Sequence, residues 1–559
     1  MNILFAFIMI LKYILARATT FGASHPIGIL LDLIFILVLS FLLRIIDSKK
    51  RVFGFFLLSA LEGAVLLWHI DNFGPIKPFA LVNLLFFADS ILFLVLYLIS
   101  GKSKKGTEKK KAYLKFASLS ILSLLVFYMI GINVQGSVFF ENKIDKPLIE
   151  KKVTGVIDKP TVKPTKQAGT VTTQVDTLRG IAKDKNVIVI QIEAFQNIMI
   201  GKTMNGVEIT PNLNKLIKES VYFKNAISQI ASGNTSDAEF MLNTSLYPIE
   251  KESPFKKYPS KDYKGLPYIM KKNGYYSASF HTNDATFWNR KNMYPSLGFN
   301  RWYDKKDFPN QEIVGYGASD RILYDKVVEK LLLMRSKKMP VYYNVITLSN
   351  HAPYKTPDWM KTVKYGKGVD GTPVGQYLKT ANYSDRQLGI FFDKLKKENL
   401  YDDAVIILYG DHFGISTKTD TDKANIKKFL GRNYDGLDTF NIPLIFKLPS
   451  NARIGTFDMP AGQIDIMPTI LNLVGIDNKE RKMYGQDLMN TKENVLGLRF
   501  YASANSYVDN SGLYTGTGKY FNFSHTREDK EPDLLKRNKL YSTLAENDKY
   551  LKKLPIIKK

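Results

Sequence analysis

The stretch Val187-Ile188-Val189-Ile190-Gln191-Ile192 is rich in β-branched residues and runs directly into an acid, Glu193. Similar apolar runs lie at residues 341–348 and 404–408, and helix-like segments such as residues 321–334 separate them. Strands that alternate with helices predict an α/β domain whose mainly parallel central sheet is covered on both faces. Ligands of such sheets bind beyond the carboxyl ends of the strands. We therefore expect a functional site at that edge.

A second predicted strand also ends in residues that carry chemistry. The run 404–408 continues through Tyr409-Gly410 into Asp411 and His412. Two carboxylates and an imidazole at strand ends of one sheet are typical ligands of a divalent cation. A helix N-cap or a buried hydrogen-bond acceptor is the alternative interpretation for each of them taken alone.

A third segment, Ser232-Gly233-Asn234-Thr235-Ser236-Asp237-Ala238-Glu239, precedes an apolar run. Ser236 and Glu239 have the spacing of a capping box, which predicts a helix that begins there with Thr235 just outside it. A hydroxyl at a helix N-terminus lies where free backbone N–H groups and the helix dipole favour an anion such as phosphate. An ordinary Thr or Ser helix cap is the alternative.

Apolar residues are concentrated in the first 134 positions. Crossing a hydrocarbon core of ~30 Å takes about 20 apolar residues. The candidate spans are residues 3–16, 27–46, 52–70, 78–100 and 112–134. The first is short and could instead be the apolar part of a signal peptide, but no small-residue cleavage site follows it. We therefore predict five transmembrane helices.

Basic loops between the predicted spans set their orientation. Lysines and an arginine occupy residues 49–51, and six lysines lie between residues 102 and 111. Short basic loops stay in the cytoplasm, so the chain beyond about Val134 is predicted to be extracellular. Three acids fall within the spans, and they either pair with nearby basic groups or face a lipid-headgroup cavity. These acids are Asp32, Glu62 and Asp89.

The composition narrows the chemistry further. The chain of 559 residues has no cysteine, which excludes disulfides, thiolate nucleophiles and iron–sulfur clusters. Its formal net charge of +26 fits nucleic acid, an anionic lipid surface or a polyanionic product. An extracellular domain would not meet cytoplasmic nucleic acid, so the expected anionic partners are the membrane surface and the polyanion, and no nucleic acid.

Five short motifs occur in the order found in the sulfatase-like branch of the alkaline phosphatase superfamily. They are Thr210-Pro211-Asn212-Leu213, Asn234-Thr235-Ser236-Asp237-Ala238-Glu239-Phe240, Tyr409-Gly410-Asp411-His412-Phe413-Gly414, Pro443-Leu444-Ile445-Phe446 and Gln463-Ile464-Asp465-Ile466-Met467-Pro468-Thr469. With five predicted spans in front, the whole chain resembles the lipoteichoic acid synthases of Gram-positive bacteria. The resemblance implies an α-helical membrane domain followed by an extracellular α/β sulfatase-like domain.

We accordingly divide the chain into four predicted parts. They are a five-span membrane domain (1–140), an extended extracellular linker (141–180), a sulfatase-like catalytic domain (181–530) and a basic C-terminal tail (531–559). The linker contains three Lys-Pro pairs and has little hydrophobic periodicity, which is typical of a tether that cannot bury a core. Relatives are often cleaved in this linker, but Lys166-Gln167-Ala168-Gly169 is a poor cleavage site. The sequence therefore does not decide whether a secreted form is released.

The resemblance assigns roles to individual residues. It implies that Glu193, Asp411 and His412 bind a metal and that Thr235 both contacts the metal and acts as nucleophile. On the same basis the expected metal is manganese, with magnesium as the next choice and zinc not excluded by the imidazole. The resemblance also implies four substrate-binding residues, which are His281, Trp288, Arg290 and His351. For Arg290 we expect paired hydrogen bonds to a phosphate.

The implied function is transfer of glycerol phosphate from phosphatidylglycerol to a growing lipoteichoic acid chain. Thr235 would carry the group as a covalent phosphothreonine-type intermediate, and diacylglycerol would leave. Alternatives with the same site are a primase that adds only the first phosphoglycerol to a glycolipid, and a phosphoethanolamine transferase. A catalytically inactive membrane scaffold is a more distant alternative. Sulfate ester hydrolysis is disfavoured, because Asn234-Thr235-Ser236-Asp237 stands where formylglycine sulfatases need Cys/Ser-x-Pro-x-Arg.

Overall fold

A computed structural model describes residues 178–366, 368–415, 419–477, 481–528 and 530–557. The five predicted spans, their three acids and nearly all of the predicted linker lie outside these residues. Among the helices that are described, none has both the length and the apolar character needed to cross a membrane. The described residues therefore concern the predicted catalytic domain and the segment that follows it.

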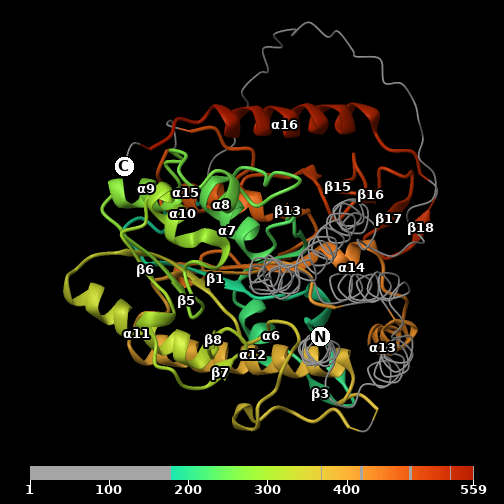
Figure 1. Cartoon of the computed structure of the whole chain (residues 1–559), viewed down its shortest axis with the longest axis horizontal. Helices are drawn as coiled ribbons and strands as arrows, with labels where there is room; N and C mark the ends of the chain where they lie inside the picture. The colour runs from blue at the N-terminus through green and yellow to red at the C-terminus, as the bar shows by residue number, and fades with distance from the viewer. Residues whose placement is uncertain (1–177, 367, 416–418, 478–480, 529, 558–559) are drawn as a thin grey trace, which may run out of the picture. The chain divides into compact units, whose positions relative to one another are not determined.

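The main sheet of the described residues contains nine strands in the order β12-β4-β11-β10-β1-β9-β5-β6, with β13 beside β4 (Figure 1). They are β1 (Val187–Ile192), β4 (Val221–Ile227), β5 (Tyr276–His281), β6 (Arg301–Tyr303), β9 (Val341–Ile346), β10 (Val405–Gly410), β11 (Asn441–Lys447), β12 (Gly455–Phe457) and β13 (Ala461–Gly462). Strand β1 is parallel to both β9 and β10, whereas β11 is antiparallel to β10 and β4. The predicted α/β domain with a mainly parallel sheet is confirmed, and β11 makes the sheet mixed.

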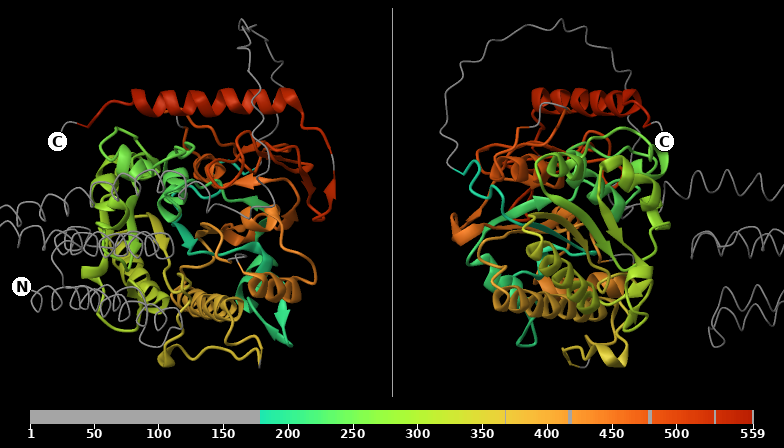
Figure 2. Two further views of the ribbon diagram at one scale, coloured as in Figure 1. Left: turned by 45° about the vertical axis from the view of Figure 1, so that its right-hand side comes forward. Right: turned by 90° about the vertical axis from the view of Figure 1, so that its left-hand side faces the viewer.

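Helices cover both faces of this sheet, as alternate residues of β1 show. Val187 and Val189 belong to a core cluster shared with α7, α8, α9, α10 and α15, whereas Ile188 and Ile190 belong to one shared with α6, α11, α12 and α13. Figures 1 and 2 show these two helix layers on opposite sides of the strands. The helices are α6 (Pro211–Ile217), α7 (Thr235–Thr244), α8 (Pro254–Lys257), α9 (Leu266–Lys272), α10 (Arg290–Leu297), α11 (Asp320–Ser336), α12 (Pro373–Lys397), α13 (Asp420–Leu430) and α15 (Ile466–Leu473). A strand buried on both faces explains the continuous apolar run of β1.

A smaller antiparallel sheet follows the main one. It contains β14 (Leu496–Gly497), β15 (Tyr507–Asp509), β16 (Gly512–Tyr514), β17 (Tyr520–Asn522) and β18 (Arg527–Glu528). The remaining elements are the hairpins β2 (Thr203–Met204) with β3 (Val207–Glu208) and β7 (Ile313–Val314) with β8 (Gly317–Ala318), helix α14 (Gly436–Phe440), and the 3₁₀ helices η2 (Asn197–Met199), η3 (Phe287–Asn289), η4 (Lys305–Asp307), η5 (Asp358–Met360), η6 (Pro449–Asn451) and η7 (Gln463–Asp465).

The segment 531–559, which the sequence suggested as a basic tail, contains the long helix α16 (Leu534–Lys553). Figure 2 shows this helix running along the outside of the domain. The side chain of Asn547 is buried and exchanges hydrogen bonds of 2.9 and 3.0 Å with the backbone of Tyr247. Leu551 joins the main core cluster. Helix α16 is therefore part of the folded domain, because Leu551 and the Asn547 amide contact residues far away in the sequence.

Candidate active site

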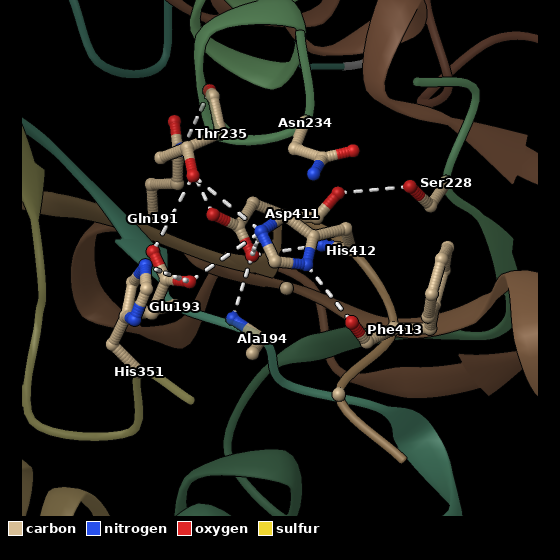
Figure 3. A network of polar contacts seen from close by, with 12 residues as sticks. Gln191, Glu193, Ala194, Ser228, Asn234, Thr235, His351, Asp411, His412 and Phe413 are labelled. Atoms are coloured by element: carbon tan, nitrogen blue, oxygen red, sulfur yellow. Dashed lines mark hydrogen bonds and ion pairs between the residues drawn. The ribbon is translucent and has the colours of Figure 1, made fainter. Parts of the chain in front are cut away.

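Three acidic and imidazole side chains meet at the carboxyl edge of the main sheet. Strands β1 and β10 pair in parallel with Ile192 opposite Gly410, so the residues that follow them leave the sheet side by side. Ligand atoms of Glu193, Asp411 and His412 all lie within 4.8 Å of one another (Figure 3). The structure thus brings the three sequence-predicted metal ligands together.

Thr235 lies at the start of α7 and faces the same cluster. Its Oγ1 is 3.5 Å from Glu193 Oε2 and 3.4 Å from His412 Nε2. Gln191, near the end of β1, donates from Nε2 to the Thr235 carbonyl at 3.1 Å and to Asp411 Oδ2 at 3.3 Å (Figure 3). A single buried amide therefore connects the threonine backbone with one of the carboxylates.

The predicted capping box at the start of α7 is wrong. Thr235 is the first residue of the helix, and Asn234 precedes it in a strained conformation with φ of 41° and no capping bond from its side chain. Ser236 Oγ donates back to the Gly233 carbonyl, at 2.8 Å, and Glu239 contacts other elements. Asp237 instead holds the loop, since its Oδ2 accepts from the N–H groups of both Ala231 and Gly233. Strain of this kind is common where a loop presents a functional group.

The electrostatics of the cluster favour a cation. Burial alone would lower the pKa of His412, but the charges of Asp411 and Glu193 outweigh it and raise that pKa to about 10. Burial raises the pKa of Asp411, and the nearby Glu193 adds to this effect, although His412 opposes it. His412 Nδ1 lies 2.9 Å from the Phe413 carbonyl, which can only accept, so Nδ1 carries a proton and Nε2 faces the carboxylates. A positive charge is therefore favoured beside Nε2, where a divalent cation would supply it.

The donor set fits a divalent metal. Two carboxylates, one imidazole and one hydroxyl form an oxygen-rich site that suits manganese or magnesium and tolerates zinc. A second group of possible ligands, Asp435, Asp438 and His525, lies elsewhere. There Arg432 donates to both oxygens of Asp438 at 2.6 Å, so this acid already has a cationic partner, and Asp435 contacts His525 at 2.9 Å. Of the two groups found among the described residues, the one around Glu193 therefore fits a metal better.

The two histidines expected to bind substrate lie near this cluster. His351 follows β9, is partly exposed, and has its Nε2 4.0 Å from Glu193 Oε1. His281 ends β5 and is buried, with Nδ1 3.0 Å from the carbonyl of Ile346. Burial lowers the pKa of His281 to about 3, and the charge of Arg290 contributes. A neutral imidazole that donates through Nδ1 leaves Nε2 as an acceptor, which suits a hydroxyl group of a ligand better than a phosphate oxygen.

Trp288 lies in η3, between β5 and α10, and Arg290 is the first residue of α10. Trp288 is half-buried in the left-handed conformation, with φ of 57°, and the ammonium of Lys256 lies 4.8 Å from the centroid of its ring. Arg290 is fully buried, and its Nε and Nη2 both donate to Glu239. Only Nη1 of Arg290 has no hydrogen-bond partner. In this structure one nitrogen of Arg290, and not the expected pair, is left to bind a phosphate.

Sequence reasoning missed three residues around the site. Gln191 could have been noticed as the one polar residue inside an apolar strand. Glu239 was assigned to a helix cap, and no local signal pointed to its partner. Tyr316, in the turn between β7 and β8, has its ring centroid 5.2 Å from that of His351 and is about half-exposed. Tyr316 could not have been predicted from the sequence, because its proximity to His351 depends on how the β7–β8 hairpin folds.

Comparison with known proteins identifies the family. The Sulfatase family profile matches residues 185–476. The crystal structure of a lipoteichoic acid synthase from Listeria monocytogenes is 32% identical, with a TM-score of 0.65, and the match covers 68% of this chain and 96% of that chain. The chain belongs to the lipoteichoic acid synthase family. The predicted resemblance is thus confirmed.

Two curated members of the lipoteichoic acid synthase family show the extent of the similarity. Lipoteichoic acid synthase 2 of Bacillus subtilis is 36% identical over 374 residues, which cover 65% of this chain and 56% of the relative. Lipoteichoic acid synthase of Staphylococcus aureus is 37% identical over 328 residues, which cover 56% of this chain and 49% of the relative. The chain therefore spans about half the length of the curated family members that it matches.

Proposed function

We propose that this chain is a phosphoglycerol transferase that moves glycerol phosphate from phosphatidylglycerol onto a growing lipoteichoic acid chain. The observation that carries the proposal is the meeting of Thr235 with Glu193, Asp411 and His412 in a member of this family. An alcohol beside three metal-ligand side chains is suited to attack phosphorus. No cysteine competes for the role of nucleophile.

The proposed metal, Mn²⁺ or else Mg²⁺, would be held by Glu193, Thr235, Asp411 and His412. When bound, it would lower the pKa of the threonine hydroxyl and polarise a phosphate oxygen. Thr235 Oγ1 then forms a bond to phosphorus, and the bond from phosphorus to the diacylglycerol oxygen breaks. The proton lost by Thr235 is balanced by the proton that diacylglycerol gains. In the second step the terminal hydroxyl of the acceptor chain attacks phosphorus, the bond from phosphorus to Thr235 Oγ1 breaks, and the proton lost by the attacking hydroxyl is balanced by the one that Thr235 regains.

The other four residues are proposed to hold the donor headgroup. Arg290 Nη1, which has no hydrogen-bond partner, and His351, whose Nε2 is 4.0 Å from Glu193 Oε1, are assigned to donate to phosphate oxygens. Trp288 would form a wall for the glycerol part. His281 accepts rather than donates at Nε2, so we assign it to a glycerol hydroxyl.

Analysis of products tests the proposed function. The full-length chain with Mn²⁺ would be incubated with phosphatidylglycerol that carries one label in the headgroup glycerol and another in an acyl chain. We expect the acyl label in diacylglycerol and the glycerol label in a polymer on the glycolipid acceptor. A single phosphoglycerol on the glycolipid would identify a primase. Transfer from phosphatidylethanolamine alone would identify a phosphoethanolamine transferase, and no transfer from any donor would leave only a scaffold.

We also propose that the chain is a multi-pass membrane protein with its catalytic domain outside the cell. The basic loops at residues 49–51 and 102–111 support this orientation. A protease added to intact cells stripped of their wall should cut beyond Glu141 and spare residues 101–111. The opposite pattern of fragments would place the catalytic domain in the cytoplasm. A fragment released without added protease would indicate natural cleavage in the linker.

A further inference from the structure

We propose that Glu239 is a positioning residue that directs Arg290 toward the phosphate of the substrate. The inference rests on the proposed function, and it adds to the site a residue that contacts neither the metal ligands nor the substrate. It would act through Arg290 alone. Four observations support it: the contacts of Glu239, the unpaired nitrogen of Arg290, the electrostatic interactions of Arg290 with His281 and Glu193, and the position of Glu239 on α7.

Both carboxylate oxygens of Glu239 are fully used. Oε1 accepts from Arg290 Nε at 2.9 Å and from Arg290 Nη2 at 2.5 Å. Oε2 accepts from Arg290 Nε at 3.2 Å and from the hydroxyl of Tyr294 at 2.7 Å. The side chains of Arg290 and Glu239 are 2% and 0% exposed. A two-pronged ion pair with a third anchor leaves the guanidinium plane little freedom to turn.

The third nitrogen of Arg290 is left without a partner. Nη1 is buried and makes no hydrogen bond, although it belongs to a charged group. A buried cationic donor that is unsatisfied is costly, and a pair formed only for stability would have its donors satisfied. An anionic ligand oxygen placed at Nη1 would remove this cost. The free nitrogen therefore indicates a binding role for Arg290.

The charge of Arg290 affects pKa values at the candidate active site. It contributes to lowering the pKa of His281, and the charge of Glu193 contributes to raising the pKa of Arg290 itself. Arg290 therefore contributes to the electrostatics of the residues around the candidate active site.

Glu239 and Thr235 lie on one helix, one turn apart. They are residues i and i+4 of α7 and so face the same side of it. The helix thus carries both the proposed nucleophile and the anchor of the proposed phosphate-binding arginine. Because a helix turn is rigid, Glu239 would hold Arg290 at a set distance from the attacking oxygen. Glu239 is therefore assigned to fix where Arg290 binds the phosphate.

The test compares Glu239→Gln with the wild type in the full-length chain. The amide has nearly the same size but cannot hold the guanidinium as a charged, two-pronged acceptor. We expect the KM for phosphatidylglycerol to rise on the order of 10-fold or more, with a smaller change in kcat. Titration of glycerol phosphate in the presence of Mn²⁺ should show the same weakening without turnover. Affinity for Mn²⁺ itself should not change.

Two further variants keep the test decisive. Glu239→Asp retains the charge but withdraws the carboxylate from Arg290, so it should also raise KM, and it serves if the glutamine variant does not fold. Glu329→Gln, an exposed acid on α11 paired with Lys326 and Lys330, is the matched control and should behave as the wild type. Wild-type KM and wild-type affinity for glycerol phosphate in folded Glu239 variants would overturn the inference. Wild-type protein that binds glycerol phosphate but transfers none would overturn the proposed function instead.

Discussion

Replacing Thr235 with alanine is expected to reduce phosphoglycerol transfer by a factor on the order of 10⁴ or more, because loss of the nucleophile removes the covalent intermediate. The fold should survive. The start of α7 does not depend on this hydroxyl, since Asp237 and Ser236 make the hydrogen bonds that hold the loop before it. The free energy of unfolding should therefore change by less than about 1 kcal/mol, whereas loss of an ordinary helix cap costs about 0.5–2 kcal/mol.

The measurement pairs turnover with thermal unfolding and peptide mapping. Wild-type protein given labelled phosphatidylglycerol without acceptor should carry the label on Thr235. Thr235→Ser keeps a hydroxyl at the same place and is the matched control, so it should retain measurable transfer and accept label at the same position. An active alanine variant, or label on another residue, would refute the mechanism even if a metal were found at the site.

Removal of the metal is expected to have the second large effect. A chelator should abolish transfer, and Mn²⁺ should restore it, because Glu193 and Asp411 bring two carboxylates into a buried cluster that favours a cation. At a concentration 100 times its Kd, Mn²⁺ should stabilise the wild type by about 2.7 kcal/mol. His412→Gln removes one ligand and should lose most of this stabilisation. Thermal unfolding with and without Mn²⁺ measures it without any need for turnover.

The second acidic group provides the control for this experiment. His525→Gln alters the cluster of Asp435 and Asp438, in which Arg432 already pairs with Asp438. This variant should keep the full response to Mn²⁺. Equal stabilisation of the wild type and His412→Gln would show that the ion binds elsewhere. Comparing Mn²⁺, Mg²⁺ and Zn²⁺ on the wild type would rank the metals.

Much of the candidate site could be predicted from the sequence because its signals are local. The apolar runs of β1 and β10 are recognisable as buried strands, and Glu193, Asp411 and His412 follow them directly. Parallel strands place their carboxyl ends on one edge, so the proximity of these three residues followed from the strand prediction. For Thr235 the Thr/Ser-rich segment before an apolar run indicated only a nearby helix N-terminus, and the family resemblance supplied its predicted role.

The predictions that failed or fell short all concern partners far apart in the sequence. Glu239 has capping-box spacing from Ser236, yet its carboxylate binds Arg290, which is 51 residues away. The segment 531–559 was predicted to be a basic tail, yet Asn547 bonds to Tyr247 across 300 residues. The antiparallel direction of β11 also has no signature within the strand itself.

The sequence by itself therefore determined the type of domain, the strand ends that carry the metal-ligand candidates and the threonine that faces them. Only the tertiary structure decided that Glu239 binds Arg290 and leaves one guanidinium nitrogen without a partner, and that α16 is part of the domain. The physical reason is that strands, helix starts and the residues beside them depend on neighbours along the chain. The choice of partner for a buried charge depends on which loops bring two side chains together, and it is made by packing and by the cost of burying an unpaired group.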